Sequence, residues 1–163
     1  MTQTARDSLI RILQNAHAGE VAAASAYRGH WKSLSDSPEK EHIQQIEAEE
    51  WEHRERVGRW LEELGSKPKP LREKVFWTIG RVIGHSCFVS GWFFPMYFAG
   101  RLESQNSVEY EDAAGLARQL GMNECVEDLL DMARVEAEHE RFFSETVTGH
   151  RLLPLMRRVF GWS

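Results

Sequence analysis

Four helix-length segments of this chain each carry a glutamate in the middle of an otherwise apolar face. Apolar residues recur at spacings of three and four within each segment, which is the pattern of an amphipathic helix with one buried face. Glu20, Glu50, Glu103 and Glu136 interrupt these four faces. An unpartnered buried carboxylate is strongly unfavourable, so the four helices must either turn these residues to solvent or gather them around positive charge.

The punctuation of the chain by glycine and proline predicts an all-α fold. Runs of alternating β-branched residues are scarce, whereas the periodic segments are long. Ser37 and Pro38 are typical of a helix N-cap and first turn. We expect four long helices and a short extra helix between the second and third of them. The expected ranges are 5–33, 38–64, 71–84 for the extra helix, 87 or 95 to 119, and 123–148.

Length and charge restrict the class of protein further. The 163 residues suffice for one domain, expected over 1–150, and a basic, apolar tail helix is expected over 151–163. A net charge of -5 disfavours a nucleic-acid partner. Cys87 and Cys125 form no CxxC pair, and the first 14 residues lack a signal-peptide core. We therefore expect a cytoplasmic protein, with peripheral contact to the inner face of the cell membrane as an open question.

Two of the four glutamates are followed, one helical turn later, by a histidine. Glu50 precedes His53 and Glu136 precedes His139, and both histidines fall on the same apolar faces as the glutamates. Residues three apart on a helix point the same way, so each pair can reach one metal ion. Glu39 and His42 repeat the spacing, but their register places His42 off the buried face, and we expect no ligand role for them.

The six residues together form a recognisable ligand set. Four carboxylates and two neutral imidazoles would balance the charge of two divalent cations. One glutamate from each of two helices and Glu-x-x-His from each of the other two is the set of ferritin-like di-metal carboxylate bundles. Carboxylate and imidazole ligands suit iron or manganese. We therefore predict a ferritin-like four-helix bundle with metal ligands Glu20, Glu50, His53, Glu103, Glu136 and His139.

The two halves of the chain repeat the same arrangement. Tyr27 and Tyr110 each follow the lone glutamate of their half by seven residues, which suggests a duplicated two-helix unit. These tyrosines are candidate catalytic residues that would hydrogen-bond substrate or relay electrons, and core packing is an equal alternative. His17, one turn before Glu20, either orients that glutamate or is structural.

Several motifs resemble the demethoxyubiquinone hydroxylase family of ferritin-like di-iron proteins. The matching motifs are "HAGE" at 17–20, "EEWEH" at 49–53, "VEAEH" at 135–139 and "KPKPLREKVFW" at 67–77. The resemblance implies two iron ions, O2, an electron donor and hydroxylation of a lipophilic quinone ring. It also implies that Glu50 and Glu136, or one of them, bridge the metals, with one histidine on each metal and Glu20 and Glu103 as terminal ligands.

The chain departs from the family pattern at three places near the site. Val21 replaces the usual tyrosine, Glu109 and Tyr110 replace a His-Tyr pair, and His30 replaces a glutamine. All six ligand positions are retained. These departures concern the substrate and the route of electrons, so a ferritin-like or rubrerythrin-like ferroxidase or peroxide-consuming protein is the alternative function.

Two apolar segments suggest a further contact surface. Residues 82–100 carry no charge, and the tail alternates apolar residues such as Phe160 and Trp162 with arginines. Both patterns suit a membrane surface, and both equally suit core packing, docking of the tail on the bundle or a contact between chains of a homo-oligomer.

Overall fold

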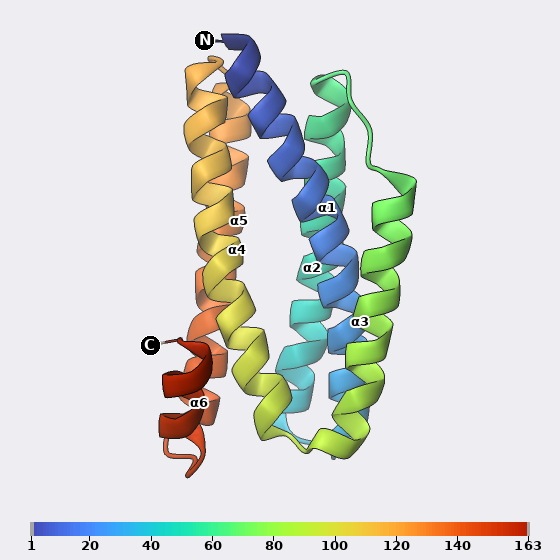
Figure 1. Cartoon of the computed structure of the whole chain (residues 1–163), viewed down its shortest axis with the longest axis vertical. Helices are drawn as coiled ribbons and strands as arrows, with labels where there is room; N and C mark the ends of the chain where they lie inside the picture. Colours follow the sequence, from blue (N-terminus) through green and yellow to red (C-terminus); the bar gives the residue numbers. More distant parts are fainter. Residues whose placement is uncertain (1, 163) are drawn as a thin grey trace.

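The chain folds into an all-α bundle, as the sequence predicts (Figure 1). A computed structural model describes residues 2–162, and within that range it contains six helices and no strand. The helices are α1 Thr2–Ser33, α2 Pro38–Glu63, α3 Pro70–Ser90, α4 Phe93–Gln119, α5 Asn123–Val147 and α6 Leu153–Phe160.

Two helical hairpins make up the four-helix bundle. Helices α1 and α2 form one hairpin and α4 and α5 form the other, and the two stand side by side (Figure 1). Helix α3 packs on α1, and α6 lies beside the lower part of α4 in Figure 1. The hairpins therefore meet each other along the inner faces of α1, α2, α4 and α5, which are the faces interrupted by glutamate.

The ends of α2 follow from local sequence. Ser37 is its N-cap, its side chain accepts a hydrogen bond from the backbone N–H of Lys40, and Pro38 opens the helix. Beyond the other end, Gly65 takes a φ of 61°, a conformation that favours glycine. The predicted boundaries of this helix are confirmed.

The extra helix, α3, is longer than expected. It has 21 residues and runs through Gly84, where the sequence indicated an end. A Cβ atom on Gly84 would lie 2.9 Å from the carbonyl oxygen of Ser25 and 3.2 Å from Cα of Gly29. Gly84 therefore permits close packing of α3 on α1, and the helix ends at Ser90, just before Gly91, whose φ is 72°. The prediction of a short helix ending at Gly84 is wrong for this reason.

Two apolar clusters fill the bundle on either side of the glutamates. Along α1, Glu20 separates Leu13 in one cluster from Ala23 in the other. Along α5, Glu136 and His139 separate members of the same two clusters. Each of α1, α2, α4 and α5 thus contributes to both clusters, and the ionisable residues occupy a single level between them.

The tail helix α6 docks on the bundle with one face. Leu153 and Met156 are buried, whereas Leu155 and Phe160 are exposed. The indole N–H of Trp162 donates a hydrogen bond to Glu140, 2.8 Å away, and its ring packs against Tyr97. Trp162 is therefore part of the bundle, and only the outer face of α6 is available for another contact.

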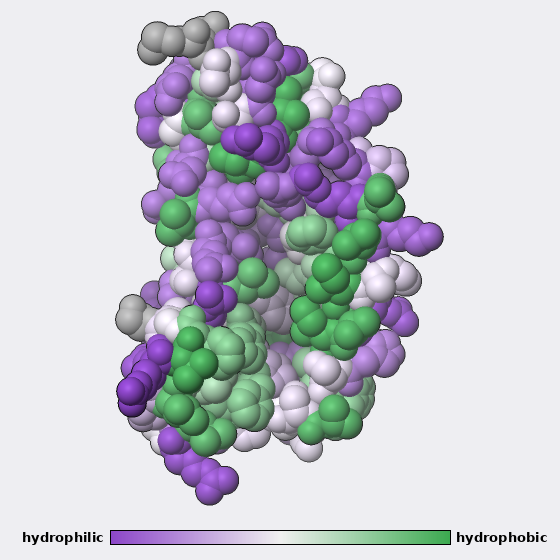
Figure 2. Space-filling view, viewed as in Figure 1, coloured by the Kyte–Doolittle hydropathy of each residue, from purple (hydrophilic) through white to green (hydrophobic). Residues whose placement is uncertain are grey.

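Large apolar side chains are exposed in two areas of the surface, one on α3 and one around α6. Many large apolar side chains of α3 are exposed, and Figure 2 shows them as one green strip, with a second green area over α6 and the start of α4. None of the helices within residues 2–162 is both long enough and apolar enough to cross a membrane.

Candidate metal centre

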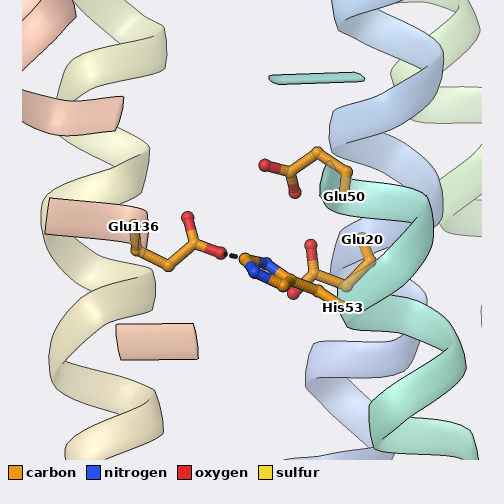
Figure 3. A group of neighbouring side chains, drawn as sticks. All are labelled: Glu20, Glu50, His53 and Glu136. Carbon is orange, nitrogen blue, oxygen red and sulfur yellow. Dashed lines mark hydrogen bonds and ion pairs between the residues drawn. The ribbon is translucent and has the colours of Figure 1, made fainter. Parts of the chain in front are cut away.

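The six predicted ligand residues meet at one level of the bundle. They come from α1, α2, α4 and α5, and each is at most 3% exposed to solvent. Glu20, Glu50 and His53 belong to one hairpin and face Glu136 of the other (Figure 3). The structure thus brings together every residue that the sequence singled out as a metal ligand.

The side chains form two overlapping groups that could each hold a metal ion. One group consists of Glu20, Glu50, His53 and Glu136, and its ligand atoms all lie within 4.8 Å of one another. The other consists of Glu50, Glu103, Glu136 and His139, with the same limit. Glu50 and Glu136 belong to both groups. The geometry is therefore that of two adjacent sites with two shared carboxylates.

Both histidines turn Nδ1 toward this centre. Nδ1 of His53 lies 2.9 Å from Oε1 of Glu136, the contact drawn as a dashed line in Figure 3. Nδ1 of His139 lies 3.5 Å from Oε1 of Glu50, and its Nε2 lies 2.7 Å from Glu49. A carboxylate on the outer nitrogen fixes the orientation and tautomer of a metal-binding imidazole.

Glu49 was missed by sequence reasoning. It is adjacent to Glu50 and therefore lies off the buried face of α2, and no periodicity marks it. Its role follows from the packing of α2 against α5, which brings it to His139.

Several buried polar atoms of the cluster have no hydrogen-bond partner among the residues that the structure describes. These atoms are Oε2 of Glu20, both side-chain oxygens of Glu50, Oε2 of Glu136 and Nδ1 of His139. Buried polar groups are otherwise almost always satisfied, and unsatisfied ones indicate a ligand or a functional site. The unpartnered atoms are all of types that bind metal, so the donor set fits a pair of cations.

Burial and mutual contacts shift the pKa values of the residues in the cluster. Burial and repulsion from Glu136 and Glu20 hold the pKa of Glu50 well above its usual range. Burial also opposes ionisation of Glu136, but contacts with Glu103 and the two histidines outweigh it and lower its pKa. Burial lowers the pKa of His139, yet contacts with Glu136 and Glu49 raise it to about 9. The cluster is thus short of positive charge in the absence of metal.

The two tyrosines connect the hairpins crosswise. The hydroxyl of Tyr27 donates to Glu103 of the other hairpin, and that of Tyr110 donates to Glu20. Both phenols are buried, and burial raises the pKa of each well above its usual range. Glu20 belongs to only one of the two ligand groups, and Glu103 belongs only to the other. Each tyrosine therefore holds the glutamate that is particular to one group.

The remaining candidate residues lie outside the cluster. Nδ1 of His17 contacts Glu73 of α3 at 2.8 Å, so its partner is not Glu20. Glu39 and His42 are exposed, and His42 stacks on Phe142 with 3.9 Å between ring centroids. The ExxH spacing at 39–42 therefore contributes nothing to the buried group.

An apolar cavity of about 490 Å³ adjoins the cluster between α1, α3 and α4. Its lining includes Tyr27, His30, Cys87 and Phe98. Figure 2 shows a hollow between the apolar strip of α3 and the apolar area over α4 and α6. Tyr27 lines the cavity and contacts Glu103, so this residue separates the cavity from the candidate metal centre.

The fold and the buried cluster define an all-α bundle of the ferritin-like class. A family model described as ubiquinone biosynthesis protein COQ7 matches residues 7–114, more than half of the chain. The chain belongs to this family. The match includes Glu20, Glu50, His53 and Glu103, whereas Glu136 and His139 lie beyond it and are placed by the structure.

Curated relatives carry a more specific name. A 3-demethoxyubiquinol 3-hydroxylase of Francisella tularensis subsp. tularensis (strain WY96-3418) is 40% identical over 72 residues, and that of subsp. novicida (strain U112) is 39% identical over 72 residues. Each alignment covers 42% of this chain and 34% of the relative. The chain thus spans about a third of the length of the curated relatives it matches.

Proposed function

We propose that this protein is an O2-dependent di-iron monooxygenase that hydroxylates the ring of a lipophilic quinone-type substrate. The observation that carries the proposal is the union of a six-residue donor cluster with an apolar cavity that reaches Tyr27. Family membership and the names of the relatives favour this function over the ferroxidase alternative.

The donor set would accommodate two metal ions. Glu50 and Glu136 would be shared by both ions, His53 and Glu20 would complete one site, and the remaining glutamate and histidine would complete the other. Iron is the metal of the proposal, and manganese suits the same ligands. Bound iron would supply the one-electron chemistry that O2 reduction requires.

The proposed reaction is balanced by an external electron donor. One oxygen atom of O2 enters a ring C–H bond and becomes a hydroxyl group, and the other leaves as water. The donor supplies two electrons, and two protons are taken up. The protein's own contribution is to keep bulk water from the cluster, whose side chains are buried, and to hold Glu103 and Glu20 through the two tyrosines.

The cavity supports an apolar ring as substrate. Alanine, isoleucine, leucine and phenylalanine side chains make up most of its wall, and its volume is within the range of small-molecule sites. A quinone ring with an isoprenoid substituent meets these requirements, because it is apolar except at its ring oxygens.

The decisive experiment follows an oxygen atom. Iron-reconstituted protein is reduced, mixed with a quinone extract and exposed to ¹⁸O2, and the products are analysed by mass spectrometry. We expect one ¹⁸O atom in a new ring hydroxyl and loss of the product in Glu136→Gln. Oxidation of the iron without any labelled ring product would favour the ferroxidase alternative.

We further propose that the protein contacts a membrane surface. A quinone substrate dissolves in the bilayer, and the exposed apolar side chains of α3 and α6 flank the hollow in Figure 2. A few apolar side chains, each contributing about 0.8 kcal/mol per buried CH2, give reversible attachment.

Liposome sedimentation tests this attachment. Val89→Ser with Phe160→Ser should reduce binding to anionic liposomes, whereas Leu130→Ser, which removes an exposed apolar side chain from α5, should not. Wild-type protein that stays in the supernatant and elutes as a dimer would assign the apolar surface to a contact between chains instead.

A further inference from the structure

One buried imidazole in the cavity has an atom without a partner. His30 is 2% exposed and lines the cavity, and its Nε2 makes no hydrogen bond to any residue within 2–162. A buried polar atom that stays unsatisfied is unfavourable by an amount comparable to a lost hydrogen bond. An apolar wall alone would not require histidine at this position.

The donor hydrogens of the other polar side chains in the cavity wall already go to protein groups. The hydroxyl of Tyr27 donates to Glu103, Ser86 donates to the carbonyl of Ile83 and Ser90 to that of Gly91. The thiol of Cys87 also contacts a backbone carbonyl, 3.3 Å away. Among the polar side-chain atoms of the wall, Nε2 of His30 is thus the buried one that has no partner within the described residues.

We propose that His30 hydrogen-bonds a ring oxygen of the substrate through Nε2 and thereby orients the ring in the cavity. The inference rests on the proposed function and adds a positioning residue to it. A neutral imidazole suits both redox forms of such a ring, because Nε2 donates to a quinone carbonyl in one tautomer and accepts from a quinol hydroxyl in the other. Burial lowers the pKa of His30 to about 4, so the ring is neutral near pH 7.

The position of His30 on α1 determines which side of the cavity an anchored ring would occupy. It follows Tyr27 by three residues, so both side chains lie on one face of the helix, about 5 Å apart along its axis. A substrate ring anchored at His30 therefore lies within one helical turn of the tyrosine that contacts Glu103. His30 acts by placing the ring toward that side of the cluster.

Two matched ligands distinguish the hydrogen bond of His30 from the apolar contribution to binding. The probes are 1,4-benzoquinone carrying one isoprenyl group and isoprenylbenzene, which lacks the ring oxygens, and affinities are measured by equilibrium dialysis with metal-free full-length protein. In His30→Leu we expect the quinone to bind about three- to tenfold more weakly, the range of one hydrogen bond, and the hydrocarbon to bind as in wild type. His30→Gln, which retains a hydrogen-bonding group, should keep quinone affinity within about twofold.

The outcomes distinguish this inference from the proposed function. Equal quinone affinity in wild type and His30→Leu, or an equal loss for both probes, would overturn the role of His30 and leave the proposed substrate class intact. Wild-type protein that binds the hydrocarbon but shows no preference for the quinone would also overturn it. Failure of wild type to bind either probe would overturn the proposed substrate class and this inference with it.

Discussion

Replacing Glu50 by leucine should stabilise the metal-free protein and reduce the further stabilisation that metal gives. Glu50 is 0% exposed and neither of its side-chain oxygens has a partner within the described chain. Such a group is unfavourable by about 1–3 kcal/mol, and more when it is charged. Leucine is similar in volume and has no polar atoms, so it removes the unfavourable free energy of the unsatisfied carboxyl group. The metal-free variant should therefore be more stable than wild type by about 1–3 kcal/mol. For a chain of this size, that corresponds to a rise in Tm of about 2–12 °C.

Metal should offset this difference in stability between wild type and the variant. A cation present at about 100 times its Kd stabilises the folded state by about 2.7 kcal/mol for one site. Glu50 belongs to both candidate sites, so the leucine variant should lose most of this gain at each of them. Addition of Fe(II) under anaerobic conditions should therefore raise the Tm of wild type by at least about 5 °C and that of the variant by much less.

Thermal unfolding followed by circular dichroism, with and without metal, measures both effects. Glu55→Leu is the matched control, because it makes the same change at an exposed position of α2 and should alter neither the metal-free Tm nor the response to metal by more than about 2 °C. A metal-free Glu50→Leu protein less stable than wild type would refute the reasoning, since it would mean that the carboxyl group is satisfied in the absence of metal.

Three further predictions concern His30, Gly84 and Glu49. Burial lowers the folded-state pKa of His30 to about 4 from an ordinary value of 6.5, so the protein loses stability as the pH falls from about 6.5 to 4. The loss from this residue is about 2 kcal/mol at pH 5. His30→Gln should therefore show a smaller difference between the free energies of unfolding measured by urea titration at pH 7 and pH 5. Gly84→Ala should destabilise the protein by about 1–3 kcal/mol, because the added Cβ would meet the backbone of α1. The control Gly115→Ala adds a Cβ in open space and should stabilise the protein by up to about 1 kcal/mol. Equal Tm shifts in the two variants would contradict the packing role of Gly84. Glu49→Gln should weaken metal binding about 10- to 100-fold in a competition titration with a chelator, because His139 loses its orienting carboxylate, and unchanged affinity would show that this contact does not matter.

The sequence predicted the inner face of the bundle better than its outer contacts. Glu20, Glu50, Glu103 and Glu136 could be found because helical periodicity reports which residues share a face, and one turn of spacing added the two histidines. Their convergence is confirmed by the structure, and their binding of metal remains a prediction. The class of fold follows from the same periodicity.

Contacts between helices were beyond the reach of periodicity. Gly84 was interpreted as a terminator because glycine is common at helix ends, but its reason is the close approach of α1. Glu49 was missed and the two alternatives for His17 could not be separated, because their partners lie on α5 and α3, which no local pattern identifies. His30 was noted only as a departure from a family pattern, and its unsatisfied nitrogen is visible only once the cavity is known.

The crosswise tyrosine contacts have a consequence for how such a molecule could have arisen. Each hairpin supplies three of the six ligand-type residues and one tyrosine that reaches the lone glutamate of the other. An ancestral hairpin with only its own residues would thus be incomplete as a monomer, whereas two copies related by a twofold axis would satisfy each other reciprocally. If the genes of the two copies fused, each half could then change independently of the other. One such difference is Glu49, since the equivalent position in the other half is Val135.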